Sequence, residues 1–451
     1  MDRLLQRARP VAELLTRQFY EWELWGRGWL VHERPICIEP PFCPFRGHHL
    51  PDRIFEDDGI QKTFFSSLAE GLLSAFKPTL APVPSEPDND ERIAIPFEAN
   101  ATLLEITIAL GKDEEPSIDV FAHFVSTLAN CRHALSFEVV STKDEITLQI
   151  AARERDASIF VQQFKAHFPE AVLTPSKLSL TTRWNEKGGV AEICEFGLHR
   201  DFYIPLCTQK NLSTDALTAL CGALDYFQDD EIAVYQVLFE PVRNDWSSSI
   251  WRALTTSNGS PFFEDAPESL KQAKAKTDSP LYAVVLRVAA KTDEESRTWE
   301  ILKNLAGALN LFSDPAGNRL VLLENDGYEL NDHKDDLLNR SSHRFGMILN
   351  AEELISFAHL PTAGVRAKNL YRRVGKTKTP PQACFQGGIV LGINEHEGRI
   401  AGVSLGTDER LRHLHVIGNS GTGKSTFLLN LICQDIYKEH GVAVLDPHGD
   451  L

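Results

Sequence analysis

The residues best suited to chemistry lie near the end of the chain, in the run GNSGTGKST from Gly418 to Thr426. This run fits the phosphate-binding pattern G-x-x-x-x-G-K-[ST] without a mismatch. Its glycines let the backbone curl so that N–H groups point at phosphate oxygens, and the N-terminus of the following helix adds partial positive charge there. The sequence therefore predicts a site for ATP with Mg²⁺.

Two side chains of this loop have individual expected roles. Lys424, the predicted catalytic residue, supplies a mobile ammonium for the β- and γ-phosphates, and Ser425 supplies a hydroxyl ligand for Mg²⁺. The other predicted ATP-binding positions are Gly418, Asn419, Ser420, Gly421, Thr422, Gly423 and Thr426. A glycine-rich turn that binds nothing is the alternative interpretation.

The acidic turn DPHGD at 446–450 allows two interpretations. Asp446 is either the Walker B carboxylate, which holds Mg²⁺ through water, or a strand-end carboxylate in a turn shaped by Pro447 and Gly449. The second is favoured, because many motors place another strand between the P-loop helix and Walker B. The Walker B, sensor and arginine-finger positions are expected beyond Leu451.

The elements around the loop are predicted to be a strand at 411–417, a helix from Lys424, and a buried strand at 442–445. A hairpin at 387–393 and 399–406 leads into them. This order predicts the start of an α/β P-loop (RecA-like) ATPase domain over 387–451. Such a core needs about 150 residues. The chain is thus interpreted as an N-terminal fragment of a longer ATPase, inactive by itself.

Upstream, residues 93–176 predict a compact α+β unit. Apolar runs at 103–110, 134–140 and 145–151 and the short AVLTP run favour strands, and segments 116–129 and 155–167 favour helices. This βαββαβ order is that of a ferredoxin-like split unit.

A second ferredoxin-like unit is predicted over 188–326. Its strands are expected at 190–198, 231–241, 281–290 and 319–325, with helices beginning after Ser213 and at 293–310. The two segments share an architecture and no clear sequence similarity. An insertion near 243–279, with Trp246, Trp251 and the lysines of KQAKAK, is interpreted as a solvated helical excursion.

Three other segments complete the domain prediction. Residues 1–78 form an α-rich aromatic leader with a helix at 61–76, and the cluster Phe19, Tyr20, Trp22, Trp25 and Trp29 is interpreted as packing, with a partner surface as the alternative. Residues 79–92 are a proline-rich acidic linker. Residues 327–386 form a basic connector, whose tract at 366–381 is either a solvated tether or a collar facing nucleic acid or a neighbouring subunit.

Two smaller constellations favour packing over chemistry. Cys37, Cys43, His48 and His49 could suggest zinc, but five residues separate the cysteines, outside the usual spacing. His413 and His415 alternate along the predicted strand before the loop, so a packed or partner-facing pair is favoured over catalysis.

Composition limits the cellular setting. The chain has 451 residues, a net charge of −17 and 43% hydrophobic residues, so its overall field repels nucleic acid. Its eight cysteines lack CxxC spacing and predict reduced thiols. No apolar run predicts a transmembrane segment or a secretory leader. The predicted location is the cytoplasm, either free or peripheral to the inner face of the membrane.

The combination HVIGNSGTGKSTFLLNLICQDI…GVAVLDPHGDL resembles the FtsK/HerA superfamily of DNA-pumping ATPases, and most of all its type IV secretion and conjugative DNA-transfer branch. The resemblance covers about residues 387–451. Stretches at 195–206, 235–246 and 343–354 are also similar to large relatives of this type. The P-loop residues carry over to Gly418, Gly423, Lys424 and Ser425, and the acidic turn to Asp446 and Asp450.

This resemblance implies ATP hydrolysis in a homo-hexameric ring with DNA in its central pore. It also implies N-terminal domains that dock partners such as a relaxase or secretion-system components. Many coupling proteins carry N-terminal membrane helices, which this chain does not show. The alternatives are a P-loop nucleotide switch that does not translocate and a docking scaffold.

Overall fold

The computed structural model describes residues 11–42, 45, 95–97, 102–111, 114–256, 259–263, 266–373, 378–396, 399–419 and 421–446. The predicted helix at 61–76, the linker at 79–92, and Cys43, His48, His49, Ser420 and Asp450 lie outside these ranges. The chain forms two compact units. The larger comprises residues up to Ile108, Asp113–Pro169 and Ser176–Tyr371, and the smaller comprises Ala109–Lys112, Glu170–Pro175 and the chain from Arg372.

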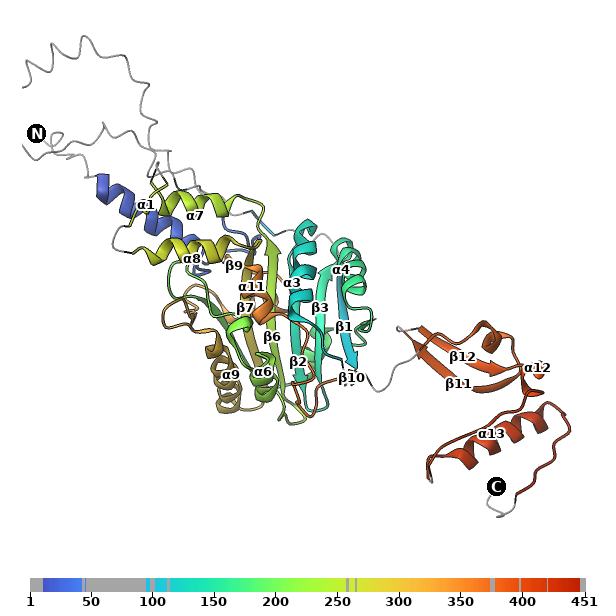
Figure 1. The fold of residues 1–451 in the computed structure, drawn as a ribbon. Coiled ribbons are helices and arrows are strands. Elements are labelled where there is room, and N and C mark those ends of the chain that lie inside the picture. The colour runs from blue at the N-terminus through green and yellow to red at the C-terminus, as the bar shows by residue number, and fades with distance from the viewer. Residues whose placement is uncertain are drawn as a thin grey trace, which may run out of the picture. The chain divides into compact units, whose positions relative to one another are not determined.

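A broad antiparallel sheet forms the centre of the larger unit (Figure 1). Its strands follow the order β1-β3-β2-β6-β7-β5-β8, with β9 also on β7. The strand β4 and the short parallel strand β10, whose residues are counted with the smaller unit above, pair with β1. The bounds are β1 Leu103–Gly111, β2 Leu135–Thr142, β3 Ile146–Arg153, β4 Val172–Pro175, β5 Val190–Leu198, β6 Ile232–Pro241, β7 Leu281–Thr292, β8 Leu320–Leu322, β9 Met347–Asn350 and β10 Arg372–Arg373.

The chain passes through this sheet twice in the same pattern. The first pass is β1, α3 (Ile118–Thr127), β2, β3, α4 (Glu154–His167) and β4. The second is β5, α6 (Leu217–Ala223), β6, β7, α9 (Glu295–Leu309) and β8. In each pass the strands lie in the order fourth, first, third, second, and the two second strands, β2 and β6, pair at the centre with Glu138 opposite Gln236.

One face of the sheet is covered by helices (Figure 1). Side chains alternate along a strand, so every second residue of β2, β6 and β7 reaches this face. There Tyr282 donates a hydrogen bond to the carbonyl of Val125 in α3, and Tyr235 donates one to Phe357, the last residue of α11 (Ala351–Phe357). The helices α3 and α4 pack through an aromatic cluster that includes Phe124, Phe160 and Phe164.

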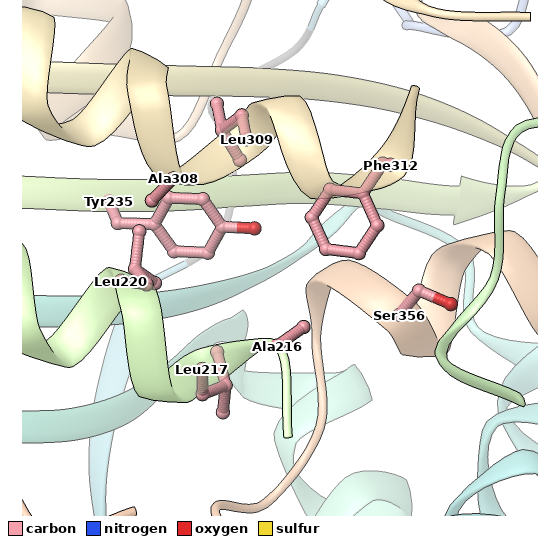
Figure 2. A pocket seen from close by; sticks show the side chains of 8 residues that line it. All are labelled: Ala216, Leu217, Leu220, Tyr235, Ala308, Leu309, Phe312 and Ser356. Carbon is pink, nitrogen blue, oxygen red and sulfur yellow. The ribbon is translucent and has the colours of Figure 1, made fainter. Parts of the chain in front are cut away.

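A small cavity lies on this helical face, between α6, β6, α9 and α11 (Figure 2). Its volume is about 10 Å³, and Leu220, Tyr235 and Phe312 are among its lining residues. Such a space holds at most one water molecule. It is a packing gap and offers no room for a substrate.

The opposite face carries a row of polar residues, one from each of five strands. Neighbours along the row are cross-strand partners: Gln149 with Glu138, Glu138 with Gln236, Gln236 with Arg287, and Arg287 with Glu195. All five are fully buried. They lie under α5 (Leu180–Glu186) and α10 (Leu330–Asn339), whose Leu180, Trp184, Leu337 and Leu338 share an apolar cluster with strand residues beside the row.

Two arginines from the segment after α10 neutralise this row. Arg340 donates from Nε and Nη2 to the carboxylate of Glu138 at 2.8 and 2.9 Å, and Arg344 donates from Nε to Glu195 at 2.8 Å. Burial alone would raise the pKa of Glu195, but Arg287, His333 and Arg344 bring it below its ordinary value. The buried charges are therefore paired and hydrogen-bonded, which buried ionic groups require.

The N-terminal segment lies along the chain that follows α10. After α1 (Val11–Trp25), His32 and Ile36 donate backbone hydrogen bonds to the carbonyls of His343 and Ser342 at 2.7 and 2.9 Å. The predicted packing role of the aromatic cluster is confirmed for Phe19 and Trp22, which are buried, whereas Tyr20 is 61% exposed. We call residues 26–38 the N-terminal strap.

The structure corrects two interpretations in the larger unit. The insertion forms the helices α7 (Trp246–Leu254) and α8 (Glu268–Thr277), and only one side of it is solvated: Lys271 and Lys274 are exposed, but Trp246 is buried, and Lys276 is fully buried beside Glu353, with Nζ 2.7 Å from the carboxylate. The segment 327–371 is not a connector, because α10, β9 and α11 belong to the core. The burial of these two segments was not predicted because their charged residues suggested a solvated surface, and the partners of these charges are distant in the sequence.

Candidate nucleotide site

The smaller unit places the phosphate-binding loop beside a two-stranded hairpin. The hairpin consists of β11 (Ile389–His396) and β12 (Arg399–Leu405), and a short helix α12 (Thr407–Arg410) follows it. The loop then leads into α13 (Lys424–Tyr437), whose first residue is the predicted catalytic lysine. The predicted hairpin and helix are thus present with nearly the predicted bounds.

Two glycines shape the loop through left-handed backbone conformations. Gly421 has a φ of 80° and Gly423 a φ of 86°, values that L-residues with side chains rarely adopt. A Cβ at either position would meet no other part of the protein within 4 Å. The backbone is therefore curled at both glycines, and the space beside each of them is open, as a phosphate-binding loop requires.

The loop residues predicted from the sequence gather around one carbonyl group. Lys424 donates from Nζ to the carbonyl oxygen of Asn419 at 2.6 Å, and Thr422 donates from its hydroxyl to the same oxygen at 2.8 Å. A Cβ on Gly418 would lie 2.7 Å from the Thr422 hydroxyl, so only glycine fits without a shift. The lysine ammonium thus already lies over the loop.

The first turn of α13 is accessible to solvent at the residues that would bind Mg²⁺ and phosphate. Ser425 and Thr426 are exposed, and Lys424 is half-buried. The helix has 14 residues, so its N-terminal amides add partial positive charge at the loop. Asp446 is half-buried and is the last residue that the structure describes. No group of three or more metal-ligating residues occurs in the described part of the chain.

Polar contacts tie the far end of α13 to the rest of the small unit. The side-chain amide of Gln434 accepts from the backbone N–H of Val390 at 2.8 Å and donates to its carbonyl at 2.9 Å, as a strand neighbour would. Asp435 accepts from both Nη atoms of Arg410, at 2.8 and 2.5 Å, and this hydrogen bonding lowers the pKa of its carboxyl.

Sequence reasoning missed these contacts, although one signal was present. Asp435 is an acid in the last turn of a helix, where the helix dipole disfavours negative charge. Such a residue suggests a specific cationic partner, here Arg410. The contacts fix the orientation of α13, and with it the direction in which the loop amides point.

Both strands predicted beside the loop are absent from the structure. Residues 411–417 form no strand, because His413 has a φ of 73° and no ladder partner is present in the described residues. Residues 442–445 likewise form no strand there. Leu411, Ile417 and Leu445 are consequently exposed. The alternation predicted for His413 and His415 is lost with the strand.

Comparison with known families identifies the chain in two parts. Residues 396–450 match the model described as helicase HerA, central domain, which supports a P-loop ATPase of the HerA/FtsK class. Residues 117–372 match the model described as domain of unknown function (DUF8128). This match covers more than half of the sequence, so the chain belongs to the DUF8128 family. No curated protein matches the chain. Among the described helices, none is long and apolar enough to cross a membrane.

Proposed function

We propose that the chain is the nucleotide-binding N-terminal part of a ring-forming ATPase that drives DNA translocation in a type IV secretion or conjugative transfer system, or in a related mobile-element or defence system. The observation that carries the proposal is the open loop at the start of α13, with the Lys424 ammonium over it, inside the segment that matches the HerA central domain.

In this proposal each loop residue has a defined task. The backbone amides of residues 418–425 bind phosphate oxygens, and Lys424 leaves the carbonyl of Asn419 to bind the β- and γ-phosphates. Ser425 holds Mg²⁺, which neutralises charge on the phosphates when bound. The ring is a homo-hexamer, and its docking partners are a relaxase or secretion-system components.

We further propose that the large unit consists of two ferredoxin-like units joined edge to edge, and that residues from 387 begin a RecA-like domain. The repeated strand order, fourth, first, third, second, supports the first assignment. In this arrangement the large unit serves docking, and the nucleotide is bound only by the smaller unit.

The first test is binding of a fluorescent ATP analogue with Mg²⁺ to the chain. Lys424→Ala is expected to lose binding by at least about tenfold, because a charge-assisted contact to phosphate is removed. Lys378→Ala is the matched control, since this exposed lysine lies in the same unit away from the loop. Equal binding by wild type and Lys424→Ala would show that the loop is a turn without a ligand.

The second test separates a motor from a nucleotide switch. In the full protein, ATP turnover should rise on addition of double-stranded DNA and should vanish in Lys424→Ala. Tight nucleotide binding with slow turnover that DNA does not change would favour the non-translocating switch.

A further inference from the structure

A second concave site lies on the larger unit, and its residues are distant in the sequence from the phosphate-binding loop. It is an open groove of about 510 Å³ at the end of the sheet where β6 begins. Its lining residues come from the segment before β6, from α9 and from the chain near residue 369, and they include Tyr226, Phe227, Gln228, Arg297, Lys368 and Asn369.

The floor of the groove is rigidly built. The two carboxylate oxygens of Asp225 accept from the backbone N–H groups of Lys368 and Asn369 at 3.1 and 3.0 Å. Arg297 donates to Glu231, to Glu300 and to the carbonyl of Tyr226, at 2.9, 3.0 and 3.0 Å. These groups hold the groove in shape without a ligand, so a partner would meet a preorganised surface.

An unusually exposed aromatic residue stands in this groove. The side chain of Tyr226 is 80% exposed although Arg297 holds its backbone carbonyl, and Phe227 beside it is half-buried. Tyrosine and arginine are enriched at the energetic centres of protein interfaces, where a large rigid ring can be covered at low entropic cost. The pair of rings favours a protein partner with apolar side chains.

The charge around the groove identifies the chemistry of that partner. The turn between β2 and β3, the segment before β6 and the start of α9 all lie at this end of the sheet. The Lys143–Asp229 ion pair at 2.6 Å and the hydrogen bonds from Asn369 to Lys143 and from Arg297 to Tyr226 show this. The exposed charged side chains of these three segments are Lys143 and the seven acids Asp144, Glu145, Asp229, Asp230, Asp293, Glu294 and Glu295. Lys368 in the groove lining and Lys187, which donates to the carbonyl of Asp229, add two cations, so acidic side chains outnumber basic ones around the groove. This field repels nucleic acid and attracts a cationic segment.

We propose that this groove docks a basic segment of a partner protein, with apolar side chains over Tyr226 and Phe227 and lysine or arginine side chains at the acidic rim. The inference does not depend on nucleotide binding. It assigns to the DUF8128 region a recognition role separate from the ATPase chemistry.

The test measures binding of a fluorescein-labelled peptide of alternating lysine and leucine to the whole chain by fluorescence anisotropy. Tyr226→Ala and Asp230→Lys should each weaken binding by about tenfold or more, because one removes the aromatic anchor and the other reverses a rim charge. Both sites are exposed, so folding should be retained, which tryptophan fluorescence verifies.

Matched variants make the test specific. Tyr437→Ala removes a tyrosine that is 87% exposed elsewhere, and Asp278→Lys reverses an exposed charge at the end of α8, so both should bind the peptide as the wild type does. Equal peptide binding by all variants would mean general attraction to an acidic protein and would overturn the proposal. Two other results would also overturn the proposal. One is binding of an oligothymidylate that depends on Tyr226, and the other is self-association of the chain that the Tyr226→Ala variant loses.

Discussion

Replacing Arg287 with methionine should break the centre of the buried polar row. Arg287 is fully buried on β7, and each of its three nitrogens donates a hydrogen bond. Nε donates to Glu195 at 2.6 Å, Nη1 to the side-chain oxygen of Gln236 at 3.0 Å, and Nη2 to the carbonyl of Ser341 at 2.8 Å. Methionine keeps much of the volume and removes all three donors.

The expected cost follows from what remains buried after the change. Glu195 retains Arg344 as a counter-charge, so its carboxylate is not left alone, but one oxygen each of Glu195, Gln236 and Ser341 loses a donor. Removing one partner of a buried ion pair costs about 3–5 kcal/mol, and each orphaned acceptor contributes about 1–3 kcal/mol within such totals. We expect a loss of about 4 kcal/mol, a large share of a typical stability of about 5–15 kcal/mol.

Urea unfolding followed by tryptophan fluorescence measures this loss selectively. All seven tryptophans lie at or before residue 299, so the signal reports the larger unit alone. The control is Arg17→Met, which removes the exposed pair Arg17–Glu21 and should change stability by less than about 0.5 kcal/mol. A similar small change for Arg287→Met would refute the argument that the row stabilises the sheet.

Two further predictions concern the contacts of the N-terminal segment. Burial raises the pKa of Glu240 to about 7. The protonated acid therefore contributes to the free energy of unfolding in full below about pH 4.5, and this contribution is lost as the pH rises through about 7. Between pH 5 and 8 the free energy of unfolding of the wild type should fall by about 2 kcal/mol, and that of Glu240→Gln should not. Urea titrations at the two pH values measure this difference, and an equal fall in both proteins would contradict the prediction. A Cβ on Gly197 would lie 2.7 Å from the carbonyl oxygen of Arg27, so Gly197→Ala should displace the N-terminal strap and cost about 1–3 kcal/mol of unfolding free energy. Gly307→Ala, in the open on α9, should instead stabilise by about 0.5–1 kcal/mol, and thermal melts in which the two variants behave alike would argue against a tight strap.

Local patterns in the sequence predicted local structure well. The strands of both passes were evident because alternating or continuous apolar runs are the main signal of strands, and the phosphate-binding loop is a contiguous motif. Long-range pairing was not visible. Glu138 and Arg340 are 202 residues apart, and nothing local marks them as partners. Lys276 likewise looked solvated, because its counter-charge Glu353 lies in another helix.

The strands at 411–417 and 442–445 show the converse error. Their apolar composition is typical of buried parallel strands, yet a strand exists only where a neighbour completes its hydrogen bonds. Composition indicates how much free energy a segment would gain from burial. It does not show whether a neighbouring strand exists, and no neighbour for either segment is present in the described residues.

The pairing of β2 with β6 has a practical consequence for dissecting the protein. Eight residue pairs join these strands, from Leu135 with Phe239 to Thr142 with Ile232. Cutting the chain between the two halves would bare the amides and carbonyls of both strands and would split Glu138 from Gln236. Each half expressed alone would therefore pair its exposed strand with another copy of itself or aggregate. Binding experiments on such a half would not report how the intact region binds a partner.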